Sequence, residues 1–246
     1  MGNPSKQQLI RHLQWDTDFW ALPVANLVDA NLHPENSQFV FDWCRQEKIR
    51  CLYFLANGAD SQSLQCAYNL GFQFVDVRVE MEYDLSNVNQ TEVPSLRIKS
   101  VSKKRELSII KLLARKSHTD SRFFKDLNFN RTKCEELYEK WIDRDFDKGN
   151  ILGFFPDERE IVKGYITLTM QSFDVARIGL IAVENDYRGL GVGSELLMKT
   201  ISLSKKLKAK KLLVATQATN TSALRLYQKA GFRISDVKIW FHKWFA

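Results

Sequence analysis

The sequence predicts an α/β (α+β) protein in which a mixed sheet is flanked by helices and preceded by a smaller N-terminal part. Three observations support this class. Short apolar runs typical of strands alternate along the chain with segments of helical periodicity. A polar segment with Pro94 in it, residues 86–95, separates two such series. A nearly continuous apolar run at 177–183 is typical of a central strand that is covered on both faces.

The polar segment divides the chain into residues 1–92 and 93–246, which we expect to be two domains. In the second part, apolar residues spaced by three and four predict helices, and alternating or continuous apolar runs predict strands. In chain order these are strand 96–101, helix 106–116, helix 134–146, strands 151–155, 161–171 and 177–183, helix 194–208, strand 211–216, helix 222–229 and strand 237–245.

The first part resembles the end of the second. It predicts a helix at 39–46, and then strand 51–55, helix 61–69 and strand 74–85. These last three elements align with the C-terminal ones at a constant offset of 160 residues, so that Gly71 corresponds to Gly231. The shared register and element order predict a partial internal repeat. Ala67 stands where the second copy has Tyr227, and we therefore expect the first copy to be a scaffold.

Composition limits the classes of partner. The 246 residues are 44% hydrophobic and 26% charged, which is ordinary for a globular protein. The net charge of +7 fits an anionic partner, either nucleic acid or a phosphorylated small molecule. The sequence has no RNA-binding or helix-turn-helix pattern, so we expect no nucleic-acid partner.

The sequence also suggests a compartment. No apolar run approaches the roughly 20 residues that cross a bilayer, and the first residues lack the apolar stretch of a signal peptide. We therefore expect a cytoplasmic protein without a membrane partner. The cysteines lack metal-ligand spacing, so we expect reduced thiols and no bound metal. They are Cys44, Cys51, Cys66 and Cys134.

The strongest motif follows the apolar run at 177–183, where the chain reads R-G-L-G-V-G (188–193) and then enters a helix. Glycines let consecutive backbone N–H groups face one point, and the helix N-terminus adds its positive end. Such a turn can hold a pyrophosphate, with Arg188 as a further cation. The alternative is a plain glycine-rich connection. The spacing fits neither a P-loop nor a dinucleotide fingerprint.

The pattern R-x-x-G-x-G (Arg188, Gly191, Gly193) after an apolar strand resembles the GCN5-related N-acetyltransferase (GNAT) superfamily. The later stretch N-x-x-A-L-x-x-Y-x-x-x-G-F (220–232) is similar to the fourth helix of that superfamily. The resemblance covers about residues 96–246. It implies a GNAT fold with a mostly antiparallel sheet and acetyl-CoA as cosubstrate. The internal repeat then predicts a truncated GNAT-like domain before it, which has no cofactor site because the first copy lacks the R-x-x-G-x-G pattern.

Carried over by position, the resemblance assigns roles to individual residues. The strand end at 181–183 would lie beside the pantetheine and offer an N–H to the thioester oxygen, and the amides of 188–194 would hold the pyrophosphate. Asn220 would bind the cofactor arm, or only cap its helix. The implied acetyl-CoA contacts are Ile181, Ala182, Val183, Arg188, Gly189, Leu190, Gly191, Val192, Gly193, Ser194 and Asn220.

Acid–base roles are assigned only in part. Tyr227 would be the general acid, since a phenol with a pKa of about 10 is protonated at neutral pH and can supply a proton to the departing thiolate. The alternative is an aromatic side chain that only packs on the sheet. No general base is assigned. The side chains considered for that role are Glu184, Asp174, Asp120 and His118.

Two segments bear on the acceptor, H-T-D-S-R-F-F (118–124) and L-Y-E-K-W-I-D (137–143). Together with A-R-I-G-L-I-A (176–182), they resemble the dTDP-fucosamine (TDP-4-amino-4,6-dideoxygalactose) acetyltransferase family of bacterial surface-polysaccharide synthesis. In that case Arg122 could pair with a phosphate, and aromatic rings could stack on the base or sugar. The alternative is a surface cation beside core aromatics. The implied substrate residues are Ser121, Arg122, Phe123, Tyr138 and Trp141.

These observations lead to the expectation of an acetyl-CoA-dependent N-acetyltransferase that acts on the amino group of a dTDP-linked 4-amino-4,6-dideoxy sugar, by direct transfer in a ternary complex. A peptide or aminoglycoside amine is the alternative acceptor, and a non-catalytic acyl-CoA-binding module is the alternative from another class. The sugar and its nucleotide, the acyl chain length, and whether the chain forms a homodimer stay open.

Overall fold

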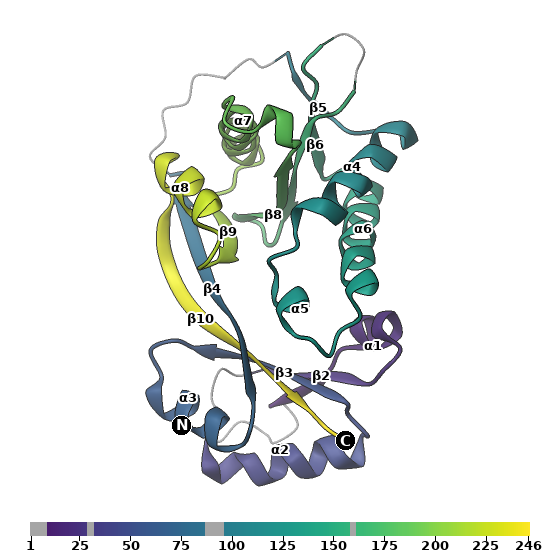
Figure 1. Ribbon diagram of the computed structural model, residues 1–246. Coiled ribbons are helices and arrows are strands. Elements are labelled where there is room, and N and C mark those ends of the chain that lie inside the picture. The colour runs from purple at the N-terminus through teal and green to yellow at the C-terminus, as the bar shows by residue number, and fades with distance from the viewer. Residues whose placement is uncertain (1–8, 29–31, 87–95, 158–160) are drawn as a thin grey trace. The chain divides into compact units, whose positions relative to one another are not determined.

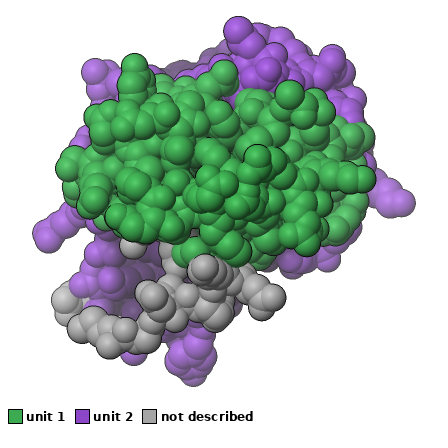
Figure 2. All heavy atoms as spheres, turned by 90° about the horizontal axis from the view of Figure 1, so that it is seen from below, with its two compact units in different colours: residues 1–78, 237–246 green, residues 79–236 purple. Residues whose placement is uncertain are grey.

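The computed structural model describes residues 9–28, 32–86, 96–157 and 161–246, and it consists of two compact units (Figure 2). Unit 1 comprises Met1–Arg78 and Val237–Ala246, and unit 2 comprises Val79–Asp236. The domain boundary expected at 92/93 falls outside the described residues. The units divide the chain instead at 78/79 and 236/237, inside two long strands, so that unit 1 is made of two separate segments.

The sheet of unit 2 is mixed and mostly antiparallel, as expected (Figure 1). Its strand order is β4-β9-β8-β7-β6-β5. Neighbours from β5 to β8 pair antiparallel, whereas β8 and β9 pair parallel. The strands are β4 (Gln73–Asp84), β5 (Ile98–Ser100), β6 (Ile151–Phe154), β7 (Gly164–Met170), β8 (Val175–Val183) and β9 (Lys211–Gln217), and β10 (Arg233–Trp244) begins in this unit.

Helices cover both faces of this sheet (Figure 1). Ile166 on β7 and Ile178 on β8 share an apolar cluster with Leu197 of α7. Successive strand residues point to opposite faces. Accordingly, Tyr165 on β7 contacts His118 at the end of α4. The helices of unit 2 are α4 (Lys104–Ser117), α5 (Arg122–Lys125), α6 (Arg131–Asp147), α7 (Val192–Lys206) and α8 (Thr221–Lys229).

Unit 1 has a smaller sheet with the order β1-β2-β3-β10. The β2–β3 pair is parallel, and the β1–β2 and β3–β10 pairs are antiparallel. Its apolar cluster includes Phe54 of β3, Phe72 and Phe241 of β10. The elements are β1 (Ile10–His12), α1 (Gln14–Trp20), β2 (Val24–Leu27), α2 (Pro34–Gln46), β3 (Cys51–Asn57) and α3 (Ser61–Asn69).

The structure contains the repeat that the sequence predicts. The bounds of β3, α3 and β4 differ from those of β9, α8 and β10 by 160 residues at both ends of each element. The cap side chains agree as well, because Asp60 accepts from the N–H of Ser63 and Asn220 accepts from the N–H of Ala223. After each helix a glycine has a positive φ, 72° at Gly71 and 98° at its counterpart 160 residues later.

The two copies exchange their long strands. In unit 1, β3 of the first copy pairs with β10 of the second, with Asn57 opposite Lys238. In unit 2, β9 of the second copy is the neighbour of β4 of the first. Equivalent hydrogen bonds close both pairs, from Phe245 N to Arg50 O (3.0 Å) and from Leu85 N to Lys210 O (2.8 Å). Each unit therefore depends on a strand segment from the other copy.

Several elements differ from expectation. The short elements β1, α1, β2 and α5 were not predicted, and the last strand begins at Arg233 rather than at 237. Within the described ranges, no helix is both long and apolar enough to cross a membrane. The described side chains form no group of three or more His, Cys, Asp or Glu residues that could hold a metal ion. All four cysteines are buried and free.

Candidate functional site

The glycine-rich turn leads from the end of β8 through the 3₁₀ turn η2 (Asn185–Tyr187) into α7. Gly189 and Gly191 have φ angles of 75° and 82°, which residues with a Cβ rarely adopt. A Cβ added to either glycine would meet none of the described atoms within 4 Å, so the space beside the turn is open. Sequence and conformation agree on why glycine is needed there.

The N-terminus of α7 lies at this open space. Gly191 is its N-cap, and the carbonyl of Gly191 accepts from the N–H of Glu195 at 3.0 Å. The N–H groups of the first turn, 192–194, precede this bond and have no carbonyl inside the helix to bind. Unpaired amides, a helix N-terminus and open space together fit the pyrophosphate of acetyl-CoA.

Arg188 fastens the turn to the strand that precedes it. Its Nε donates to the carbonyl oxygen of Val183 at 2.9 Å. This bond leaves the two terminal nitrogens of the guanidinium as further donors. The expected role as a cation beside a phosphate stays a prediction, and the structure adds a positioning role within the turn.

A β-bulge lies where β7 meets β8. The register passes from Ile166–Ile181 to Leu168–Ile178, so two residues of β8 oppose Thr167 alone. The hydroxyl oxygen of Thr167 accepts from the N–H of Leu180 at 2.9 Å. A Cβ at Gly179 would approach that oxygen to 2.6 Å, so a glycine is required for the bulge.

Beyond this bulge, β8 and β9 continue past their paired segment. The parallel register between them spans Val175–Arg177 and Lys211–Leu213, whereas the strands run on to Val183 and Gln217. Residues 181–183 keep their β7 partners on the other edge. The edge of β8 toward β9 is therefore the place where the expected pantetheine contacts of 181–183 would form.

Tyr227 is enclosed on α8. Its side chain is 3% exposed, and its ring centroid lies 5.6 Å from that of Phe232. Burial raises the pKa of the phenol above its ordinary value of 10. No hydrogen-bond partner for its hydroxyl is found among the residues that the structure describes. The phenol is thus held protonated, as a general acid requires, and it also packs on the sheet.

Asn220 has the capping role that was one of its two expected interpretations. Its side-chain oxygen accepts from the N–H of Ala223 at 3.1 Å and from the hydroxyl of Ser222 at 3.0 Å. These bonds occupy the oxygen, and the amide NH₂ group is the part that could also reach a cofactor. The cofactor role stays a prediction.

The expected substrate residues lie together but are mostly packed against one another. The guanidinium of Arg122 lies 4.0 Å from the ring centroid of Phe123, which is 4% exposed. Tyr138 is 3% exposed and meets Trp141 at a centroid distance of 5.2 Å. Ser121 is buried as the N-cap of α5. These rings form a packed cluster, and stacking on a base or sugar would need them to rearrange.

Two of the four candidate bases have clear surroundings in the structure. His118 is half-buried at the end of α4, with its Nε2 2.8 Å from the Tyr165 hydroxyl and its ring stacked on Tyr138 at 4.9 Å. Burial lowers the pKa of His118 to about 4, so the ring is neutral at pH 7. Asp174 lies instead in the turn before β8, where its carbonyl accepts from Lys210 N.

Sequence reasoning missed Tyr165 and the environment of His118. Tyr165 is fully buried on β7, and burial raises the pKa of its phenol. In the sequence it was one aromatic among the residues of a strand, and His118 was one of several candidate bases with no partner assigned to it. The only indication in the sequence was that Tyr165 stands among apolar strand residues. Such a pattern predicts burial of the ring but does not identify the partner of its hydroxyl.

Comparison with known proteins agrees with this geometry. The Acetyltransferase (GNAT) family model matches residues 116–232. This part of the chain belongs to that family. The GNAT match includes the glycine-rich turn and all of α8, and acetyl-CoA is the cosubstrate of the family. The expected GNAT superfamily, fold class and enzyme class, an N-acetyltransferase, are confirmed.

Two relatives carry names. The chain is 26% identical over 132 residues to "Spore coat polysaccharide biosynthesis protein SpsD" of Bacillus subtilis. The aligned residues cover 54% of this chain and 45% of that protein. It is 24% identical over 192 residues to "dTDP-fucosamine acetyltransferase" of Escherichia coli O6:H1. This alignment covers 75% of this chain and 78% of that acetyltransferase. The chain thus matches less than half the length of the first relative.

Solved structures of GNAT proteins share the fold. A GCN5-related N-acetyltransferase from Sphaerobacter thermophilus superposes with a TM-score of 0.67 at 12% identity, over 96% of this chain and 76% of that one. At this identity the likeness concerns the fold alone. Because it covers nearly all of this chain, the fold likeness also includes the part that precedes the family match.

Proposed function

We propose that this GNAT protein transfers the acetyl group of acetyl-CoA to the amino group of a nucleotide-linked sugar, a dTDP-4-amino-4,6-dideoxy sugar. The observation that carries the proposal is the similarity to dTDP-fucosamine acetyltransferase, because it covers 75% of the chain and so extends beyond residues 116–232. The name of the second relative, a protein of spore coat polysaccharide biosynthesis, supports the same class of acceptor.

The residues of this chain fit the binding half of the reaction. Acetyl-CoA supplies an acetyl group activated as a thioester. The amides of 192–194 and the open turn at Gly189 and Gly191 would hold its pyrophosphate. A backbone N–H of 181–183, on the edge of β8 beyond its paired segment, would stabilise charge on the carbonyl oxygen.

Two side chains bear on the proton transfers of the proposed reaction. Tyr227 holds a proton on its hydroxyl at neutral pH, because burial raises the pKa of the phenol. In the proposed reaction this proton goes to the departing sulfur as the C–S bond breaks. The attacking amine must also lose a proton, and the ring of His118 is neutral but a weak base, because burial lowers its pKa to about 4. No base is assigned, because water could accept that proton as well.

The test is a turnover assay that follows the release of free CoA thiol. The acceptors are dTDP- and UDP-linked 4-amino sugars, with peptides and aminoglycosides as the comparison set. We expect turnover with at least one dTDP-4-amino sugar and at least tenfold lower turnover with the comparison set. Activity confined to peptides or aminoglycosides would overturn the acceptor. Tight acetyl-CoA binding with no turnover on any amine would favour a binding module.

A further inference from the structure

A pocket of about 330 Å³ lies between the C-terminal half of α4 and the segment that follows β8. Its apolar wall consists of Ile109, Leu112 and Leu113 from α4. Its polar side carries Lys116 from the last turn of the same helix, together with Glu184 and Arg188. The volume is at the lower end of the range for ligand pockets, so it suits part of a larger ligand.

The charge of Lys116 is not neutralised as the neighbouring charges on α4 are. Lys111 pairs with Asp143 at 2.9 Å, and Arg115 pairs with Glu135 at 2.9 Å, so both of these cations are bound to α6. Lys116 points to the pocket instead, and no carboxylate lies within ion-pair distance of it among the described residues. Two cations thus face a single carboxylate in this pocket, which favours an anion.

Ser117 gives a second, independent indication. Its hydroxyl oxygen is buried and has no hydrogen-bond partner within the described part of the chain, and the residue lines the pocket. A buried hydroxyl without a partner costs about 1–3 kcal/mol. A ligand oxygen in the pocket would supply the missing partner.

The expected phosphate-binding side chain, Arg122, is less suited to this role. Its guanidinium lies over the Phe123 ring, which itself packs against Trp141 in the aromatic cluster. The pocket is separate from that cluster, and its lining residue Glu184 directly follows Val183, the last residue of β8. A ligand there would lie next to the strand end where the acetyl group is expected.

We propose that the pocket between α4 and the β8–α7 segment binds the diphosphate of the acceptor, held by Lys116 and Arg188. In this proposal the side chain of Arg188 serves the acceptor, and the pyrophosphate of acetyl-CoA is held by the backbone amides of 192–194 instead. The inference rests on the proposed function and names the contacts of the acceptor for it. The ammonium of Lys116 supplies a point charge, and the free guanidinium nitrogens of Arg188 supply a planar pair of donors. The apolar wall of α4 would lie against the base or sugar.

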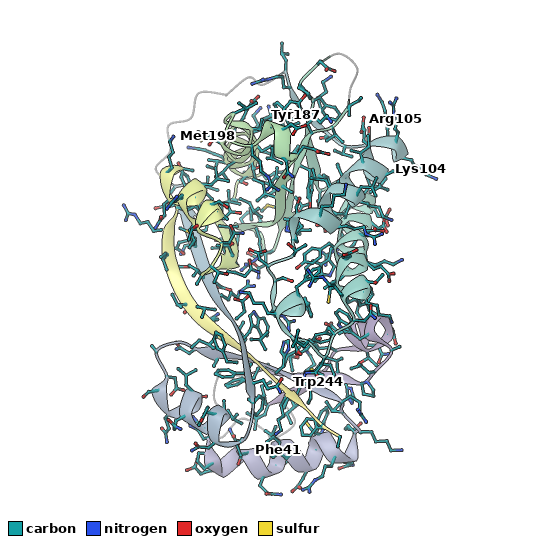
Figure 3. All side chains as sticks on the ribbon, in the orientation of Figure 1. Phe41, Lys104, Arg105, Tyr187, Met198 and Trp244 are labelled. Carbon is teal, nitrogen blue, oxygen red and sulfur yellow. The ribbon has the colours of Figure 1, made fainter. Side chains whose placement is uncertain are left out.

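Substitution of Glu184 should change the affinity for a diphosphate in the opposite direction to substitution of Lys116. The carboxylate of Glu184 repels a diphosphate in the same pocket, so Glu184→Gln is expected to strengthen binding where Lys116→Ala weakens it. A purely structural effect on α4 or on the turn would not give opposite signs. Lys104→Ala is the matched control, because Lys104 lies on the same helix at its opposite end (Figure 3) and outside the pocket.

The experiment is calorimetric titration of the full chain at low salt with dTDP, CoA and inorganic pyrophosphate as probes. We expect Lys116→Ala to raise the Kd for dTDP about fivefold, Glu184→Gln to lower it about threefold, and Lys104→Ala to leave it unchanged. The CoA affinity should stay within twofold in all three variants. Melting temperatures confirm that each variant is folded.

Four outcomes separate the possibilities. A Kd for dTDP that is independent of Lys116 overturns the pocket and leaves the proposed acceptor intact. A loss of CoA affinity in Lys116→Ala assigns the pocket to the cosubstrate and likewise overturns the inference. If pyrophosphate binds in a way that depends on Lys116 and dTDP does not bind, the result supports a diphosphate site and contradicts a thymidine-linked acceptor. Binding of neither phosphate probe overturns the pocket.

Discussion

At the scale of single residues, burial determines which protons are available. Tyr227 packs against Phe232 with 3% of its surface exposed, and its phenol keeps its proton because burial raises the pKa. The same shift makes the phenol a weaker acid toward a thiolate, whose parent thiol has a pKa near 8.5. A proton from Tyr227 is therefore expected to move only as the C–S bond breaks, when the sulfur becomes basic.

Replacing Tyr227 by Phe removes this proton and little else, because the ring remains to pack on Phe232. We expect turnover to fall about 10²- to 10⁴-fold with the Kd for acetyl-CoA unchanged. Steady-state rates and equilibrium titration measure the two quantities. In the wild type, titration of the phenol should cause no loss of rate below about pH 10. Turnover within threefold of wild type would contradict the general-acid role.

His118 links pH to stability. The pKa of the ring is about 4 in the folded chain, below the ordinary 6.5, so between these values the unfolded chain binds the proton and the folded chain does not. Stability is therefore full above pH 6.5 and falls toward pH 4, and the loss at pH 4.5 should be about 2–3 kcal/mol. Urea unfolding of wild type and His118→Gln at pH 7 and 4.5 measures this difference. An equal loss of unfolding free energy in the two proteins would show that the His118 ring is not responsible for the pH dependence.

At the scale of elements, the turn between β8 and α7 combines a conformational need with an expected binding role. Gly149, at the end of α6, has a φ of 67° and nothing within 4 Å of an added Cβ, as Gly191 does. Replacing either glycine by Ala should cost about 1–2 kcal/mol of stability, because both residues have a left-handed backbone conformation that Ala rarely adopts. The two positions therefore form a matched pair.

We expect Gly191→Ala to weaken acetyl-CoA binding at least tenfold and Gly149→Ala to leave it unchanged, although both lower the melting temperature. The reason is that only Gly191 shapes the amides at the start of α7. Calorimetric titration with acetyl-CoA and thermal melts provide the measurements. Equal affinities for the two variants would mean that the turn does not form the pyrophosphate site.

Most elements could be predicted from their own residues, and the exceptions have local causes. Helix α2 begins at Pro34, five residues before the expected start, because the helix signal there is a proline at N1 rather than an apolar stripe. The strands β1 and β2 have only 3 and 4 residues, too short for alternation to be recognised.

The candidate site divides in the same way. The turn at 188–193 could be predicted because its glycines and its helix are contiguous in the sequence. The bond between His118 and Tyr165 could not, because it joins a helix end to a strand 47 residues later. The pocket beside Lys116 has the same origin, since α4 and the segment after β8 meet only in the folded chain.

At the scale of the whole molecule, the exchange of long strands makes residues 237–246 part of unit 1. Their removal would leave β3 without the partner that runs from Lys238 to Trp244. We expect the amides of β3 to lose protection from hydrogen exchange, and those of β8 and α7 in unit 2 to keep it. Exchange followed by mass spectrometry of peptides resolves the two units. Unchanged protection in β3 would contradict the strand pairing.

The same exchange sets an order of events for a chain that emerges from the ribosome. Asn57 can pair with Lys238 only after nearly the whole chain has been made. Contacts this distant in sequence are slow to form because a long loop must close first. Unit 1 comes first in the chain, yet its sheet is completed last. Until then, β3 presents an unpaired apolar edge, which is where nascent chains of this protein would associate with one another.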